Sequence, residues 1–161
     1  MGIVKKFKLW LALRNTENQL RSFAVGMNST VDIPQDLHII MLDYDIADLE
    51  KVRESVEELQ GFWMLADAQV FRTKHGYHVF FFNDIVPYER LKLIIDYAKY
   101  VDPQFKYISK YYDKKTIRVA GKYEHKDISF VETIKGIRTP STWEREIGEM
   151  KRGEHKSLLR M

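Results

Sequence analysis

The clearest hydrophobic pattern in the chain is an apolar run that ends in two acidic residues. Residues 38–46 read HIIMLDYDI, with four consecutive apolar residues directly before Asp43, Tyr44 and Asp45. Residues two apart in an extended strand project from the same face. The pattern therefore predicts a strand over 37–46 whose end carries the carboxylates of Asp43 and Asp45 side by side.

A second strand is predicted where an aromatic run follows a tight turn. Residues 73–82 read TKHGYHVFFF, and residues 74–76 have the composition of a hairpin turn. Because side chains alternate along a strand, His78 is expected to share a face with Phe80 and Phe82.

Helical periodicity predicts three helices. The first begins near Asp48 and stops at Gly61, and its apolar stripe is Leu49, Val52, Val56 and Leu59. The second runs from Pro87 to Asp102 and Pro103, and it buries Leu91, Ile94, Ile95, Ala98 and Val101. The third starts at a capping box of Ser141 and Glu144 and carries Trp143, Ile147 and Met150.

The remaining segments are interpreted as strands, turns and loops. Segments 62–73 and 76–84 predict two strands around the turn at 74–76, and 105–112 with 116–123 predict another pair that turns at 113–115. A further strand is expected over 128–133. The N-terminal segment 3–25 fits either period, and we favour a hairpin of 6–13 with 19–25. Residues 26–35 are expected to form a loop.

The order of these elements over 37–112 is strand, helix, strand, strand, helix, strand. This order is typical of the ferredoxin-like and RNA-recognition-motif folds, so the expected class is α+β with an antiparallel βαββαβ sheet. Right-handed crossovers place the third strand beside the first, and the fourth on the other side of the first. Asp43 and Asp45 would then meet His78 on the open face of the sheet, with Asp102 nearby.

Composition bounds the domain organisation and excludes some chemistry. With 161 residues, 45% of them hydrophobic, the chain suits one domain over 1–150, with a core at 37–123 and a basic tail at 151–161. The absence of cysteine excludes disulfides, cysteine-bound zinc and thiol catalysis, and the five histidines lack paired ligand spacing. The N-terminus predicts neither a signal peptide nor a membrane span, so a cytoplasmic protein without a membrane partner is expected.

The paired acids suggest a chemistry. Two carboxylates that share a strand face repel each other unless a cation lies between them, so Asp43 and Asp45 predict a divalent metal site for Mg²⁺ or Mn²⁺. A neighbouring His78 and the basic segment 106–126 are suited to binding phosphate groups. This combination favours metal-dependent nucleotidyl transfer.

These motifs resemble those of the archaeo-eukaryotic primases and primase-polymerases. Leu42-Asp43-Tyr44-Asp45 is similar to the family's Asp-x-Asp motif at the end of a strand. Thr73-Lys74-His75-Gly76-Tyr77-His78 is similar to its small-x-His motif, although Gly76 stands where Ser is usual. Ile117-Arg118-Val119-Ala120-Gly121-Lys122 is similar to its arginine- and glycine-containing segment. The resemblance covers roughly residues 37–123.

The resemblance implies roles for individual residues. Asp43 and Asp45 would bind the metal, with Asp102 the best-placed third acid, and His78 would contact the phosphates of the incoming nucleotide. Lys74, Arg118 and Lys122 would add positive charge there. The implied activity is a primase-polymerase in replication, for example of a plasmid or virus. Its implied partners are a DNA template, nucleoside triphosphates and a helicase or polymerase.

Other interpretations of the same residues stay open. Asp45 is also a common helix-capping residue, His78 is also typical of a packed strand, and Asp102 with Pro103 is a sufficient helix terminator. The aromatic segment 76–82 also resembles the strand on which RNA-recognition motifs stack bases, which predicts a non-catalytic module that binds single-stranded nucleic acid. A purely structural subunit is a third class, because fold does not determine function.

Overall fold

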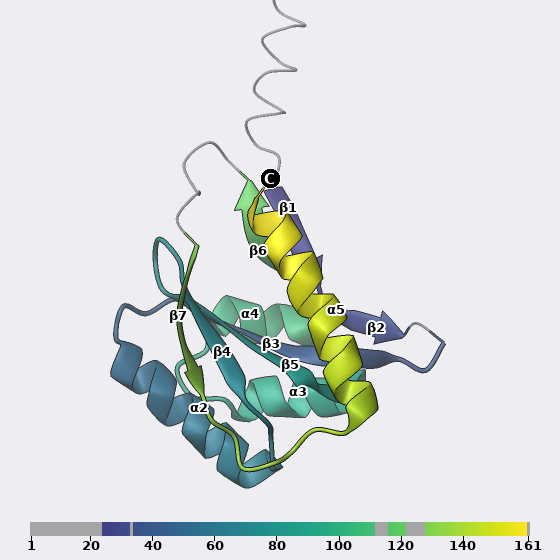
Figure 1. Ribbon diagram of the computed structural model, residues 1–161. Coiled ribbons are helices and arrows are strands. Elements are labelled where there is room, and N and C mark those ends of the chain that lie inside the picture. The colour runs from purple at the N-terminus through teal and green to yellow at the C-terminus, as the bar shows by residue number, and fades with distance from the viewer. Residues whose placement is uncertain (1–23, 33, 112–115, 122–127, 161) are drawn as a thin grey trace, which may run out of the picture.

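The protein has an α+β fold built on a five-stranded antiparallel sheet (Figure 1). The computed structural model describes residues 24–32, 34–111, 116–121 and 128–160. The strands of this part are β1 (Ala24–Asn28), β2 (Thr30–Asp32), β3 (Leu37–Tyr44), β4 (Ala68–Arg72), β5 (Tyr77–Pro87), β6 (Thr116–Gly121) and β7 (Ser129–Ile134). Its helices are α2 (Leu49–Trp63), α3 (Tyr88–Tyr97), α4 (Pro103–Ser109) and α5 (Thr142–Leu159).

The sheet order is β2-β3-β5-β4-β7, and every neighbouring pair is antiparallel. Strands β3 and β4 are therefore parallel to each other, with β5 inserted between them and α2 as their connection. The sequence predicted that the third strand of the unit lies beside the first, and the pairing of β5 with β3 confirms this. A separate two-stranded sheet pairs β1 with β6.

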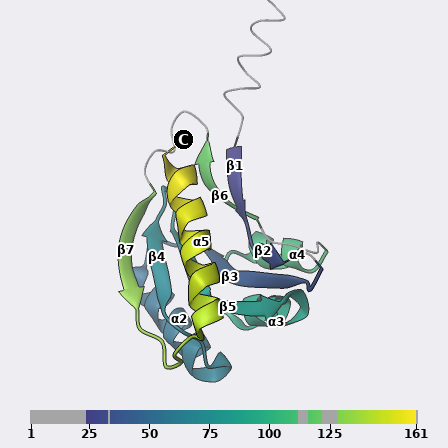
Figure 2. The same ribbon diagram turned by 45° about the vertical axis from the view of Figure 1, so that its right-hand side comes forward.

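Helices cover both faces of the five-stranded sheet. On one face α3 packs against β3 and β5, and the hydroxyl of Tyr44 hydrogen bonds Ser55 of α2 at 3.0 Å. On the other face α5 runs across β5, as Figures 1 and 2 show. The core between these layers is formed by the interiors of β3 and β5 and by the stripes predicted for α2 and α3. Because both faces are covered, the expected open face is not present.

The predicted strand at 105–112 is wrong, because residues 103–109 form α4. The Asp102 carboxylate accepts hydrogen bonds from the backbone N–H groups of Gln104 and Phe105, and Pro103 occupies the first turn. Phe105 and Ser109, four residues apart, are the buried positions of this helix. The sheet position expected for that strand, beside β3, is taken by the short strand β2.

Two further expectations change near the N-terminus and at the end of α2. Residues 26–35 were expected to form a loop, but they contribute to β1 and β2. The hairpin predicted over 6–25 lies almost entirely outside the described residues. Helix α2 continues past Gly61 to Trp63, and the C-cap residue Met64 adopts a left-handed conformation (φ 56°).

Helix α5 begins at the predicted capping box, which forms with both hydrogen bonds between Ser141 and Glu144. Of the three apolar residues that the sequence places on this helix, Trp143, Ile147 and Met150, the first and the last are exposed. The buried residues are Gly148, Lys151 and His155. Residues 151–159, which the sequence assigned to a basic tail, therefore belong to the packed fold. None of the helices in the described ranges has the length and apolar character needed to cross a membrane.

Candidate functional site

Asp43 and His78 lie directly opposite each other on the adjacent strands β3 and β5. The distance from His78 Nε2 to Asp43 Oδ1 is 3.7 Å, and the His78 side chain is 9% exposed while that of Asp43 is 36% exposed. The predicted meeting of the two motifs is thus observed. The Asp43 side chain is partly exposed, whereas the imidazole is largely enclosed.

The turn before β5 fixes this register. The N–H of Thr73 donates to the carbonyl oxygen of Gly76 at 2.9 Å, and the N–H of Gly76 donates to Thr73 Oγ1 at 3.0 Å. These bonds close the predicted turn between β4 and β5. Lys74 is exposed in this turn, so it presents its charge at the same end of the sheet as Asp43.

The other two predicted acids also lie at this end of the sheet. Asp45 is exposed immediately after β3. The backbone N–H of Asp102 donates to the carbonyl oxygen of Asp43 at 2.8 Å, so these two residues are neighbours. The Asp102 carboxylate, however, caps α4. Within the described ranges, no three acidic or histidine side chains are grouped to hold a metal ion.

The predicted basic residues are only partly within the described residues. The backbone of Arg118 lies in β6, which pairs with β1 and also contacts β3. The side chain of Arg118 and the whole of Lys122 lie outside the described part of the chain. Their predicted roles in phosphate binding stay predictions.

His78 is electrically neutral at pH 7. Burial, together with a smaller effect of the neighbouring His155, lowers the pKa of this imidazole to about 3. Its Nδ1 atom is buried without a hydrogen-bond partner. His78 can therefore offer a phosphate a hydrogen bond but no positive charge.

Helix α5 covers the face on which His78 lies. The ring of His155 is 4.6 Å from that of Phe80 and 6.0 Å from that of Phe82, measured between centroids. The aromatic residues of β5 are all buried. The stacking surface expected for an RNA-recognition-motif-like module on this strand is therefore occupied by the protein itself.

Arg72 is a candidate that the sequence interpretation missed. It lies opposite Tyr77 at the end of β4, it is exposed, and its Nη1 donates to the Tyr77 hydroxyl at 3.0 Å. This places a second cation next to the turn that carries Lys74, on the sheet face opposite to that of Asp43 and His78. In the sequence, the feature that could have identified Arg72 is its position directly before that turn.

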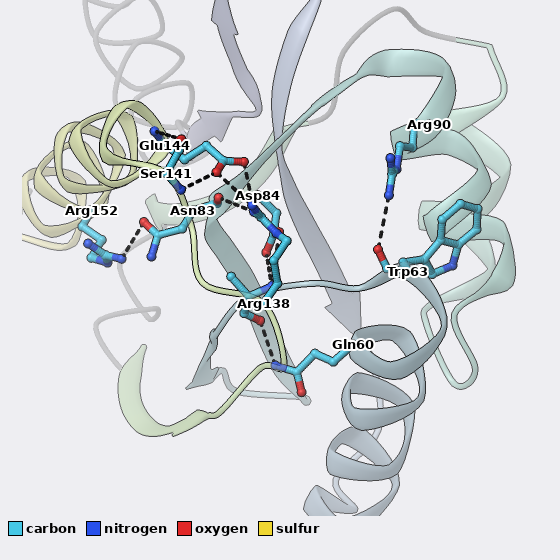
Figure 3. Close-up of polar contacts among 10 residues, drawn as sticks. Gln60, Trp63, Asn83, Asp84, Arg90, Arg138, Ser141, Glu144 and Arg152 are labelled. Carbon is cyan, nitrogen blue, oxygen red and sulfur yellow. Dashed lines mark hydrogen bonds and ion pairs between the residues drawn. The ribbon is translucent and has the colours of Figure 1, made fainter.

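A pocket of about 230 Å³ lies at the opposite end of β5. Figure 3 shows the polar contacts of several residues that line it, among them Asp84, Arg138 and Glu144. Arg138 lines this pocket and donates to the buried Asp84 at 2.7 Å and to Glu144 at 2.9 Å. Burial raises the pKa of Asp84, although Arg138 and the N–H of Ala66 oppose that shift. Since these charges bind each other, the cluster holds the segment before α5 against β5.

Comparison with protein-family models, curated proteins and solved structures gave no match for this chain.

Proposed function

We propose that the protein is a metal-dependent nucleotidyltransferase of the primase-polymerase type. The observation that carries the proposal is the cross-strand pair of Asp43 and His78, with the exposed Asp45 directly after it. An acid-rich strand end next to an enclosed imidazole suits a metal-bound triphosphate better than it suits a packed core.

The donor set fits Mg²⁺ or Mn²⁺ that is partly coordinated by substrate. Mg²⁺ usually retains several waters and binds one or two carboxylates together with substrate phosphates, so it does not require a complete protein cage. Asp43 and Asp45 are accessible enough to reach such an ion. When bound, the ion would neutralise developing charge on the phosphates.

The surrounding residues would bind and orient the nucleotide. His78, which is neutral, would donate an N–H to a phosphate oxygen, and the exposed Lys74 would supply positive charge. Arg118 and Lys122 would add to this charge, as the resemblance implies. Asp102 would serve mainly by holding the start of α4 against Asp43.

The order of the elements also supports a more specific proposal for the fold. We regard the chain as a variant of the ferredoxin-like fold in which α4 replaces the final strand of the βαββαβ unit. The support is the observed order β3-α2-β4-β5-α3 with β5 between two parallel strands.

The decisive experiment measures nucleotide binding and primer synthesis with Mn²⁺ and a DNA template. Asp43→Asn with Asp45→Asn is expected to abolish metal-dependent nucleotide binding in calorimetry and to stop synthesis. Glu57→Gln, which removes an exposed acid from α2, is the matched control and should change neither. Equal affinity for the metal–nucleotide complex in the double variant would refute the proposal.

The alternative is a non-catalytic module that binds single-stranded nucleic acid. Because the aromatic residues of β5 are buried, such a module would bind through another surface. Strand binding that persists in chelator, without any synthesis, would favour this alternative.

A further inference from the structure

Helix α4 and the turn after it present two adjacent pairs of side chains to solvent. Tyr107 and Tyr111 are 62% and 67% exposed, and their ring centroids are 4.9 Å apart. Residues four apart lie on the same helix face, so the two rings form one continuous aromatic surface. Exposed large aromatic side chains that gather in this way mark an interaction site more often than scattered ones do.

A pair of lysines flanks the tyrosines at the preceding positions. Lys106 Nζ donates to the carbonyl oxygen of Asp96 at 2.9 Å, and Lys110 Nζ lies 3.6 Å from the Asp96 carboxylate. These contacts hold Lys106 and Lys110 beside the two tyrosines, and both tyrosine rings stay exposed. Residues 103–111 contain no acidic residue, and the two lysines outnumber the single carboxylate of Asp96 beside them, so this surface keeps a net positive charge.

The aromatic and basic surface begins next to the proposed metal site. Asp102 starts α4, and its N–H bonds the carbonyl oxygen of Asp43 at 2.8 Å. Figures 1 and 2 both show α4 alongside β3, the strand that carries Asp43. A chain bound along α4 would therefore lead towards the acidic end of the sheet.

We propose that Tyr107, Tyr111, Lys106 and Lys110 form a platform for single-stranded nucleic acid. Bases would stack on the two tyrosine rings, and the lysines would bind the backbone phosphates. Stacked aromatic residues beside basic ones are the usual means of binding single strands without sequence preference. The role of this strand as template rests on the proposed function, but its binding to α4 does not.

The test is fluorescence anisotropy with a labelled oligothymidylate of about 12 nucleotides, the size class that one small domain binds. Tyr107→Ala with Tyr111→Ala is expected to weaken binding roughly tenfold or more, because stacking contributes substantially for each base. Tyr107→Phe with Tyr111→Phe keeps the rings and should retain binding. Lys110→Gln should weaken binding and reduce its dependence on salt, unlike Lys135→Gln at a distant exposed site.

The matched control is another exposed aromatic pair, Phe62 and Tyr97, whose ring centroids are 4.6 Å apart. This pair lies next to the acidic side chain of Glu58, which Tyr97 contacts, so Phe62→Ala with Tyr97→Ala should leave binding unchanged. Unaltered binding in the Tyr107 and Tyr111 alanine variant, or no binding by the wild type, would overturn the platform.

The two proposals fail separately. The Tyr107 and Tyr111 variant should keep its affinity for the metal–nucleotide complex, and the Asp43 and Asp45 variant should keep its affinity for the oligonucleotide without metal. If the Tyr107 and Tyr111 alanine variant loses oligonucleotide affinity while the Asp43 and Asp45 variant keeps its nucleotide affinity, the platform stands and the nucleotidyltransferase proposal falls.

Discussion

Gly76 lies directly against the backbone carbonyl of Tyr44, at the end of the strand that carries Asp43. A Cβ atom at position 76 would be 1.8 Å from the Tyr44 oxygen and 2.9 Å from its carbonyl carbon. The close approach brings the turn at 73–76 down onto the end of β3. The glycine that departs from the primase pattern thus has a structural reason, because a serine there would collide with the backbone.

Gly76→Ala is therefore expected to destabilise the protein by about 1–3 kcal/mol, since the turn or β3 must move to admit the methyl group. Urea denaturation gives the free energy of unfolding. Gly61→Ala is the control, because a Cβ at this exposed position in α2 meets nothing within 4 Å. Alanine there should stabilise the protein by up to about 1 kcal/mol. Equal effects of the two substitutions would contradict the packing argument.

His155 is expected to make the stability of the protein depend on pH. Burial against the sheet lowers the pKa of this imidazole from 6.5 to about 4. Below pH 6.5 the His155 side chain binds a proton in the unfolded chain but not in the folded protein. The free energy of unfolding is therefore at its full value above this pH and declines as the pH falls towards 4. The slope from one such group is at most about 1.4 kcal/mol for each pH unit.

Urea denaturation at several pH values from neutral to mildly acidic measures this slope. His155→Phe keeps a ring against Phe71 and Phe80 but removes the titrating group. The variant should lose less stability on acidification than the wild type does. The remaining dependence is expected from His78, whose pKa shifts in the same direction. Identical slopes in both proteins would exclude His155 as a source.

The sequence predicts those elements whose signals are local. The apolar run before Asp43 forms β3, the stripe from Leu49 to Leu59 lies on α2, and the pair of Ser141 and Glu144 starts α5. The pairing of Asp43 with His78 also follows from the sequence, because the order of strands and helices determines which strands are neighbours.

Other elements depend on contacts that local patterns do not encode. Aromatic residues at alternate positions favoured a strand over 105–112, but the cap from Asp102 and the burial of Phe105 and Ser109 favour a helix. Helix α5 packs on β5 through Gly148, where a Cβ would be 1.9 Å from Asn83 Oδ1. A buried face made of glycine, lysine and histidine gives no hydrophobic stripe, so the covering of the sheet was not foreseen.

Lys151 shows how a charged residue is accommodated on that face. Its Nζ donates to the carbonyl oxygen of Asn28 at 3.0 Å and to Glu154 at 2.9 Å. The aliphatic part of the side chain is buried while the ammonium group keeps its hydrogen bonds. Such a partner, 123 positions away in the sequence, cannot be inferred from periodicity.

A structural role of His78 and a functional one predict different effects of replacing it. The Nδ1 atom of His78 is buried without a partner, and an unsatisfied buried polar group costs about 1–3 kcal/mol. His78→Phe should therefore keep or raise the free energy of unfolding. If His78 binds the nucleotide, the same variant should bind the Mn²⁺–nucleotide complex at least about tenfold more weakly, a loss of roughly 1.4 kcal/mol.

His155→Phe is the matched control for this experiment. His155 is equally enclosed, its Nε2 also lacks a partner, and its ring packs on Phe80, as does that of His78. Of the two, only His78 lies opposite Asp43. The control should therefore match His78→Phe in stability but retain nucleotide affinity. If both variants bind nucleotide as the wild type does, His78 is a packing residue. A functional His78 requires that His78→Phe keep or gain stability and lose affinity for the Mn²⁺–nucleotide complex.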